Sequence, residues 1–313
     1  MPELGFALSS EDHGPSDLVE QAGLAEQAGF TFALISDHYH PWIRKQGHSP
    51  FVWATLGGIA QATSTLRIGT GVTCPLIRQH PALVAQAAAT VACMAEGRFF
   101  LGVGTGEQLN EHVFGARWPA PDERLDMLEE AVEVMRLLWK GEDTTHRGTH
   151  YTVDRAQIFD VPDDDIEIYV AAAQAKMAEL AGRIGDGLIS TSPDEDVVKK
   201  FGQDKPKLGM MHVAYDTDAK KALKRAHELW PNTALQGSLG QELPTPQDFE
   251  DAAPMVSPDD VGKITPHGPD AEPYLEQIRK FEQAGFTHVY IHQIGDNQKE
   301  FCEWASRELL QST

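Results

Sequence analysis

Segments with the character of buried strands alternate with amphipathic helices along almost the whole chain of 313 residues. Each strand candidate is a short apolar run, and most are followed by a stretch whose apolar residues recur at helical spacing. Eight strands are expected, at residues 4–8, 30–35, 66–72, 99–103, 166–171, 187–191, 208–215 and 287–292. Such alternation predicts a parallel sheet, and eight strands close most simply into a (β/α)8 TIM barrel, an α/β fold.

The connections between these strands also have a recognisable pattern. Helices are expected at 17–28, 51–62, 81–94, 124–138, 176–184, 219–229, 274–284 and 298–310, and a hairpin within 145–153. Residues 231–269 contain seven prolines and little periodicity. We interpret them as an insertion over the site, because no second core follows them. The chain is therefore expected to be a single barrel domain, residues 1–313, with an insertion at about 231–269.

An open, doubly wound sheet is the alternative architecture. It ranks second because the G-x-G-x-x-G pattern expected after the first strand is missing. Gly102, Gly104 and Gly106 belong to the fourth strand and its turn, and they have the wrong spacing. A nicotinamide-binding fold of that type is therefore disfavoured.

The overall charge and the cysteine content limit the functional classes. A formal net charge of −21 argues against a nucleic-acid or anionic-membrane surface, because phosphate binding requires a basic patch. Cys74, Cys93 and Cys302 show no C-x-x-C spacing, so we expect neither a disulfide framework nor structural zinc, and we assign core packing to Cys93 and Cys302. No signal-peptide pattern and no apolar run of membrane-spanning length is seen. We expect a soluble cytoplasmic protein that acts on a small molecule.

Polar side chains follow several of the predicted strands and should meet in one cavity, because the carboxyl ends of barrel strands share a face. They are Asp37 and His38, Cys74, Glu107 with Asn110, Ala173 with Gln174, and Thr191. An imidazole exchanges protons near neutral pH, and a carboxylate beyond a glycine turn can face the same cavity. His38 and Glu107 are therefore candidates for an acid–base pair.

Simpler interpretations of these residues stay open. His38 could be held by a backbone carbonyl, Glu107 could cap a helix, and Trp42 could pack in the core rather than stack on a ligand. His40 and His48 have no partners at metal-ligand spacing, so no metal is assigned. No G-x-S-x-G elbow occurs, which leaves proton and hydride transfer as the favoured chemistry.

Four segments together resemble the bacterial luciferase-like superfamily, in the branch of coenzyme F420-dependent glucose-6-phosphate dehydrogenase. They are residues 36–42 (SDHYHPW), 47–51 (GHSPF), 100–110 (FLGVGTGEQLN) and 181–187 (AGRIGDG). The resemblance implies a TIM barrel, a homodimer and a bound deazaflavin, coenzyme F420. It implies that His38 and Glu107 transfer protons, with Trp42 beside the reacting centre. It also implies a cis peptide bond between Gly71 and Val72. The implied cofactor contacts are Asp37, Gly71, Val72, Cys74, Thr105, Gly106, Asn110, Ala173, Gln174, Lys176 and Met177.

Three departures from the family pattern concern the cofactor and the substrate. Cys74 stands where the family usually has threonine, and Ala173-Gln174 replaces a pair of glycines. The glucose-6-phosphate enzyme has a lysine shortly after a Thr-Ser pair, whereas here Thr191 leads into Asp194. A carboxylate repels a phosphate dianion. Residues 249–277 add only Lys263 as a cation, so we expect an uncharged alcohol or sugar, with Thr191 near it, rather than glucose 6-phosphate.

The sequence thus favours an F420-dependent oxidoreductase that transfers a hydride between the cofactor and an alcohol or sugar-type substrate. His38 is the preferred base and Glu107 the preferred acid, although the two roles could be exchanged. An FMN-dependent monooxygenase of the same superfamily is the second interpretation, and a non-catalytic flavin-binding barrel is the third.

Overall fold

A closed barrel of eight parallel strands forms the centre of the computed structural model, which describes residues 1–235 and 237–312. Going round the barrel, the strand order is β1-β10-β9-β8-β7-β4-β3-β2. The strands are β1 (Glu3–Leu8), β2 (Phe32–Ile35), β3 (Arg67–Thr70), β4 (Phe99–Val103), β7 (Glu167–Ala171), β8 (Gly187–Ser190), β9 (Lys207–Val213) and β10 (His288–Gln293). The predicted (β/α)8 TIM barrel is confirmed.

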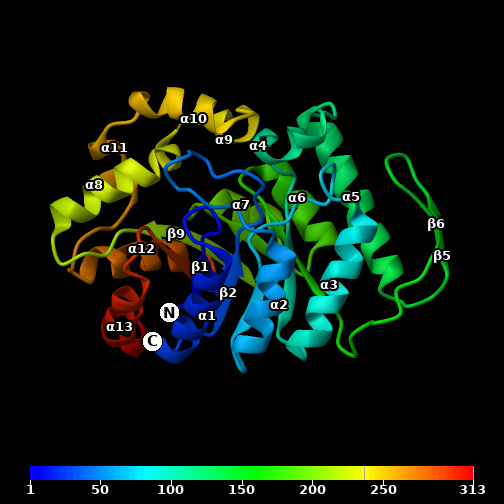
Figure 1. Cartoon of the computed structure of the whole chain (residues 1–313), viewed down its shortest axis with the longest axis horizontal. Helices are drawn as coiled ribbons and strands as arrows, with labels where there is room; N and C mark the ends of the chain where they lie inside the picture. The colour runs from blue at the N-terminus through cyan, green and yellow to red at the C-terminus, as the bar shows by residue number, and fades with distance from the viewer. Residues whose placement is uncertain (236, 313) are drawn as a thin grey trace.

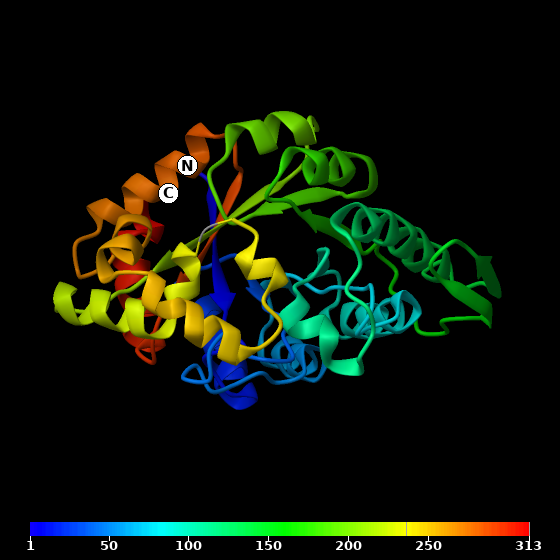
Figure 2. The ribbon, with the colours of Figure 1, turned by 90° about the horizontal axis from the view of Figure 1, so that it is seen from above.

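Helices surround the barrel on its outside (Figures 1 and 2). The outer helices are α1 (Pro15–Ala28), α2 (Val52–Ala62), α3 (Pro81–Ala95), α5 (Pro121–Leu138), α6 (Ala175–Ile184), α7 (Glu195–Phe201), α8 (Ala219–Leu229), α12 (Glu272–Gln283) and α13 (Gln298–Glu308). α1 packs against both α2 and α13, so the two ends of the chain lie side by side, as both figures show.

Two helical regions differ from the sequence-based expectation. α5 begins at Pro121, earlier than expected, because Pro121 takes the first helical position, where its missing N–H is not needed. α7 was not predicted. The side chain of Asp194 accepts hydrogen bonds from the backbone N–H groups of Asp196 and Val197. Asp194 is therefore the N-terminal cap of this helix.

Residues 231–235 and 237–269 contain more helix than their proline content suggests. They contain η2 (Pro231–Ala234), α9 (Leu239–Glu242), α10 (Pro246–Ala252), η3 (Ala253–Met255) and α11 (Pro258–Ile264). Pro246 and Pro258 start helices, each preceded by a capping residue, Thr245 or Ser257. Figure 1 shows α9, α10 and α11 along one end of the barrel, on the side of α4 (Gln108–Glu111).

The hairpin expected within 145–153 is present as β5 (Thr144–Arg147) and β6 (Thr152–Ala156). Both views show it projecting beyond α5, at the edge of the molecule (Figures 1 and 2). The hairpin is attached to α5 through Glu130, whose carboxylate accepts hydrogen bonds from the backbone N–H groups of Thr149, His150 and Tyr151.

Aromatic side chains fill the interior of the barrel. Phe32, Phe100, Tyr169 and Tyr290 are all buried there, with aliphatic residues between them. A Cβ atom on Gly69 would collide with the ring of Phe100, so the absence of a side chain lets that ring enter the barrel. A packed interior restricts a ligand site to the open mouth.

Two further expectations can be compared with the structure. Cys302 is buried as expected, but Cys93 is exposed, so core packing was the wrong assignment for Cys93. Its position in α3 faces away from the barrel rather than toward it.

Within residues 1–235 and 237–312, no helix combines the length and the apolar character needed to cross a membrane.

Candidate functional site

The loop after β2 carries the principal polar residues across the mouth of the barrel. β2 ends at Ile35, and Asp37 and His38 follow before the chain re-enters a helix at Val52. These residues lie at the carboxyl edge of a parallel barrel, where enzymes with this fold carry their sites.

His38 is held with one ring nitrogen toward a carbonyl and the other toward a carboxylate. Nδ1 lies 3.1 Å from the carbonyl oxygen of His40, which can only accept, so Nδ1 carries a hydrogen and donates it. Nε2 lies 3.4 Å from Oε1 of Glu11. The Trp42 ring lies 5.0 Å from the imidazole and packs edge-on against Phe249. The backbone-held interpretation of His38 therefore applies to Nδ1 and leaves Nε2 for proton transfer.

Glu11 is a site residue that the sequence analysis missed. Its carboxylate is buried and accepts hydrogen bonds from the hydroxyls of Ser36, at 2.6 Å, and Ser9, at 3.0 Å. Glu11 follows β1 as His38 follows β2, and these strands are neighbours. That shared position after adjacent strands was the signal that could have revealed the pair.

The carboxylate of Asp37 lies in a buried network of protein donors. It accepts hydrogen bonds from Thr73 at 2.9 Å, Gln79 at 2.7 Å and Arg78 at 2.9 Å. Arg78 also forms an ion pair with Glu111 at 3.5 Å. Burial raises the pKa of Glu111, and this effect outweighs the lowering by the Arg78 cation. Asp37 thus fixes the loop that presents His38.

Asn110 connects the loop of His38 to Glu107. Its side-chain oxygen accepts from the backbone N–H groups of Tyr39, at 2.9 Å, and His40, at 3.3 Å, while Nδ2 donates to Oε2 of Glu107 at 3.3 Å. Glu107 is the N-cap residue of α4, but its side chain makes no capping hydrogen bond. The helix-capping interpretation of its carboxylate is therefore wrong.

Small residues form the part of the mouth beside β3 and β4. The peptide bond between Gly71 and Val72 is cis, as the resemblance implied. Gly106 has φ +75°, and a Cβ atom there would lie 2.6 Å from Sγ of Cys74. Burial raises the pKa of the Cys74 thiol well above its usual range, as does the nearby Glu111 carboxylate, so Cys74 stays a neutral thiol. Thr105 and Gly106 are half-buried.

The remaining predicted contacts gather at the start of α6. Ala173, Gln174 and Lys176 are exposed and Met177 is half-buried, while Thr191 is exposed beyond β8. The first backbone bond of this helix runs from Ala178 N–H to the Gln174 carbonyl. The N–H groups of Ala175, Lys176 and Met177 therefore precede the intrahelical bonds. Lys176 forms an ion pair with Asp122 at 2.6 Å.

Comparison with known proteins identifies the family. The sequence profile described as luciferase-like monooxygenase matches residues 3–288. The chain belongs to the luciferase-like monooxygenase family. It is 36% identical to a protein named F420-dependent glucose-6-phosphate dehydrogenase from Nocardia farcinica (strain IFM 10152), over 98% of this chain and 96% of that one. A second protein, named F420-dependent glucose-6-phosphate dehydrogenase 1, from Rhodococcus jostii (strain RHA1), is 37% identical over 98% and 97%.

One solved structure is similar along the full length of this luciferase-like chain. It is described as an F420-dependent secondary alcohol dehydrogenase in complex with an F420-acetone adduct. The TM-score is 0.92 at 30% sequence identity, covering 100% of this chain and 99% of the other.

The cations that could hold a phosphate group are few at the mouth of this luciferase-like barrel. Asp194 lies just beyond Thr191 and caps α7. Lys263, on α11, is exposed and forms an ion pair with Asp260 at 2.9 Å. Neither position offers the unpaired cation that a sugar phosphate requires.

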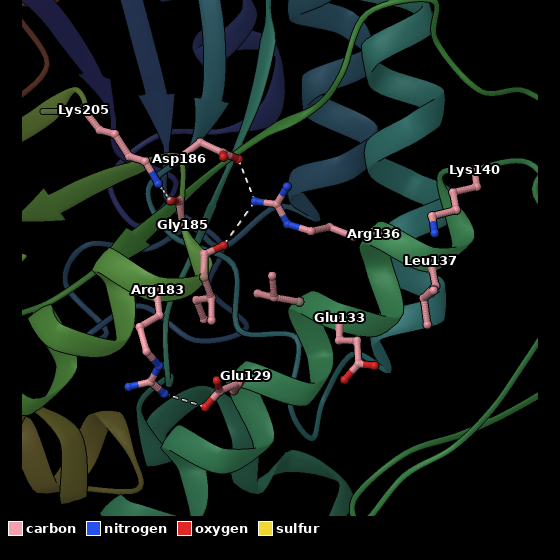
Figure 3. A pocket seen from close by; sticks show the side chains of 11 residues that line it. Glu129, Glu133, Arg136, Leu137, Lys140, Arg183, Gly185, Asp186 and Lys205 are labelled. Atoms are coloured by element: carbon pink, nitrogen blue, oxygen red, sulfur yellow. Dashed lines mark hydrogen bonds and ion pairs between the residues drawn. The ribbon is translucent and has the colours of Figure 1, made fainter. Parts of the chain in front are cut away.

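A separate hollow of about 550 Å³ lies on the outside of the barrel, between α5 and α6 (Figure 3). Three of its four cations already have partners: Arg136 donates to Asp186 at 2.8 Å, Arg183 to Glu129 at 2.7 Å, and Lys205 to the Gly185 carbonyl at 2.7 Å. We assign no function to it.

Among the residues that the structure describes, no group of three or more His, Cys, Asp or Glu side chains could hold a metal ion.

Proposed function

We propose that this protein is a coenzyme F420-dependent oxidoreductase that transfers a hydride between F420 and an uncharged alcohol or sugar-type substrate. The observation that supports this most strongly is the similarity, over the whole chain, to the structure described as an F420-dependent secondary alcohol dehydrogenase. The relatives named F420-dependent glucose-6-phosphate dehydrogenase agree on the cofactor.

The side chains at the mouth fit a flat ring with an anionic tail. Gly71, Gly104 and Gly106 keep the surface beside β3 and β4 free of side chains, and a Cβ atom on Gly104 would lie 2.8 Å from Val72. The unbonded N–H groups at the start of α6 suit an anionic group, because a helix N-terminus carries a partial positive charge. When bound, F420 supplies the deazaflavin ring that accepts or gives the hydride.

The other proposed cofactor contacts lie on two sides of the mouth of the barrel. We assign Asp37, Cys74, Thr105 and Asn110 to the side of β2, β3 and β4. We assign Ala173, Gln174, Lys176 and Met177 to the side of α6. Thr191 is assigned to the substrate.

His38 and Glu107 are the proposed proton-transfer groups. Oxidation of an alcohol removes a hydride from carbon and a proton from oxygen, so a base must hold that proton. Nε2 of His38 can accept it, and the carboxylate of Glu11, 3.4 Å away, balances the charge of the imidazolium that results. Glu107 then serves as the acid on the cofactor side. Trp42 fixes the orientation of the imidazole by packing against it.

The proposed preference for an uncharged substrate follows from the charges around the mouth. Asp194 and the Lys263–Asp260 pair leave no free cation for a phosphate dianion at these positions. We therefore expect glucose 6-phosphate to be a poor substrate, in contrast to the named activity of the relatives.

The first experiment is an equilibrium titration of the purified apoprotein with F420 and, separately, with FMN, followed by fluorescence. Tight binding of F420 alone supports the proposal, whereas preference for FMN together with oxygen consumption during turnover would favour the monooxygenase chemistry of the family's description. Binding of neither cofactor would contradict both.

The proposed base has its own test. We expect His38→Ala to bind F420 normally and to lower turnover with secondary alcohols by about 10² to 10⁴-fold. His48→Ala is a suitable control, because His48 is exposed on the same loop. Wild-type turnover by His38→Ala would contradict the assigned role. Loss of all three residues, His38, Trp42 and Glu107, without any loss of measurable function would support a non-catalytic barrel.

We further propose that residues 1–313 form a single barrel domain and that the segment 231–269 closes over its mouth. We also propose that the protein is cytoplasmic and forms a homodimer. The three cysteines are all free, which suits a reducing compartment. Light scattering coupled to size-exclusion chromatography tests the dimer, and a monomer at micromolar concentration would contradict it.

A further inference from the structure

Two histidines face each other inside the mouth of the barrel, on neighbouring strands. His212 on β9 is paired in register with His292 on β10. Leu208 and Tyr290, an even number of residues earlier on the same strands, belong to the cluster inside the barrel. Because side chains alternate along a strand, both imidazoles also point into the barrel, near its carboxyl end.

The two rings and a carboxylate form a continuous chain. Nδ1 of His212 lies 2.7 Å from Nδ1 of His292, and Nε2 of His292 lies 3.5 Å from Oδ2 of Asp12. Nε1 of Trp230 donates to the same oxygen at 2.7 Å. The side chains of Asp12 and His292 are 5% and 3% exposed. Nε2 of His292 has no hydrogen-bond partner, which leaves the carboxylate as the group it faces.

The carboxylate favours one direction of the hydrogens in this chain. Nε2 of His292 makes no hydrogen bond, but Asp12 stabilises the tautomer that has its hydrogen on this nitrogen, because an ionised carboxylate only accepts. Nδ1 of His292 is then an acceptor, and the hydrogen between the rings belongs to His212. Nε2 of His212 is left as a lone-pair acceptor. Burial lowers the pKa of His212 well below its usual range, and the neighbouring His292 lowers it further, so the ring stays neutral.

This chain belongs to the same mouth as the proposed catalytic pair. The hydroxyl of Ser9 lies 3.0 Å from Oε2 of Glu11 and 3.3 Å from Oδ2 of Asp12. Glu11 is in turn 3.4 Å from His38. Within residues 1–235 and 237–312, Nε2 of His212 makes no hydrogen bond or ion pair.

We propose that Asp12 and His292 orient His212 so that its Nε2 accepts a hydrogen bond from a second hydroxyl of the substrate, distinct from the hydroxyl that is oxidised. The inference rests on the proposed function and narrows it, because it selects uncharged diols and polyols over simple alcohols. A neutral acceptor matches a hydroxyl donor and offers no charge to a phosphate. His212 is thus a substrate-binding residue, while Asp12 and His292 are positioning residues.

The tautomer can be measured without any turnover. Long-range ¹H–¹⁵N correlation spectra of the ¹⁵N-histidine protein, assigned with His212→Phe, should show Nδ1 of His212 protonated and Nε2 bare. Addition of butane-2,3-diol to the F420 complex should shift the Nε2 resonance, and butan-2-ol should shift it less. A protonated Nε2 in the wild type would overturn the inference.

Kinetics with the same matched alcohols test the consequence. We expect wild type to prefer butane-2,3-diol over butan-2-ol in kcat/KM by about fivefold to tenfold, the value of one neutral hydrogen bond, and His212→Phe to lose that preference. Asp12→Leu should also lose it, because it removes the acceptor that orients His292. Asp12→Asn should retain it, because an amide oxygen still accepts there.

A control variant separates this effect from general damage to the barrel. His288 lies at the opposite end of β10 and faces Glu3 at 3.3 Å, so His288→Phe should leave the diol preference unchanged. An equal preference in wild type and His212→Phe, with alcohols still oxidised, overturns this inference and spares the proposed function. If no alcohol reduces F420, the proposed function fails, and the spectra then decide the tautomer alone.

Discussion

At the scale of single residues, Arg78 connects more of the site than any side chain singled out from the sequence. Its guanidinium is 6% exposed and lies 2.9 Å from Asp37 and 3.5 Å from Glu111. Its backbone N–H also donates to Glu111 at 2.7 Å. Both carboxylates are almost completely buried, so this one cation compensates two charges that have lost their water.

Arg78→Met should therefore destabilise the protein by about 3–5 kcal/mol, because two buried carboxylates lose their cation. Urea unfolding followed by circular dichroism measures the change. Arg117→Met is the matched control, since the Arg117–Glu123 pair is exposed and its loss should leave the free energy of unfolding almost unchanged. An equal loss in the two variants would contradict the role assigned to Arg78.

The three catalytic candidates that sequence reasoning found share one property: each follows directly on a strand, or lies in the loop that a strand starts. His38, Trp42 and Glu107 are of this kind. Glu11 also follows a strand, β1, but its role and that of Arg78 were missed because they depend on contacts with distant parts of the chain. Ser36 and Glu11 are 25 positions apart, and Arg78 and Asp37 are 41 apart. Strand order places loop starts, but the direction in which a loop turns its side chains depends on packing.

At the scale of elements, the carboxylate of Glu26 holds α1 to the segment that enters β3. It accepts hydrogen bonds from the backbone N–H groups of Ser64, Thr65 and Leu66 at 2.6–2.9 Å. Burial would raise the pKa of Glu26, but the bonds from Thr65, Leu66 and Ser64 prevail and lower it to about 2. The charged form is therefore favoured by folding.

This shift predicts a defined pH dependence. Because the folded-state pKa lies below the ordinary value of 4.5, the stabilisation is complete above that pH and is lost as the pH falls toward 2. Glu26→Gln should thus be less stable than wild type near neutral pH, and the difference should shrink between those limits. Urea midpoints across the pH range measure it, with Glu20→Gln, exposed on the same helix, as the control. A difference that stays constant down to pH 2 would exclude this explanation.

Two helices of the segment 231–269 begin with a sequence pattern that predicts a helix start, although the high proline content suggested irregular structure. Thr245 and Ser257 each precede a proline at the first helical position, and Asp248 and Asp260 close a capping box three residues later. This pattern is typical of helix starts. Seven-residue helices are too short to show apolar periodicity, so only the caps could have revealed them.

One aromatic contact fastens this segment to the site. Phe249 on α10 is 1% exposed and packs edge-on against Trp42 at 5.1 Å. Phe249→Ala should lower the free energy of local unfolding of α10 by about 3–5 kcal/mol, because the helix loses its buried ring. Amide exchange in α10 should then become faster than in the barrel strands. Met255→Ala, at a position 77% exposed, should change neither measurement. Unchanged exchange in α10 of the Phe249 variant would show that other contacts hold the segment.

At the scale of the whole molecule, the barrel was predictable because its evidence is repeated. Each of eight strand segments adds to the same conclusion, and an error at one boundary, such as the end of β3 at Thr70 rather than at 72, leaves the topology unchanged. Closure itself depends on β1 pairing with β10, residues 3 and 288, which no local pattern reveals. The count of eight strands alternating with helices, which close most simply into a barrel, supplied that step.

The charge of the molecule is also a global property, and it predicts a response to salt. Forty-seven acidic residues against 26 basic ones give −21, so the compact state is subject to self-repulsion at neutral pH. Raising NaCl from about 0.05 M to about 0.5 M shortens the screening length from roughly 14 Å to roughly 4 Å and should raise the Tm. Near pH 4.9, the sequence pI, the same salt series should give little or no increase, because the net charge is close to zero. A Tm that falls with salt at neutral pH would mean that exposed ion pairs, such as that of Arg136 with Asp186, outweigh the repulsion between the acidic surfaces.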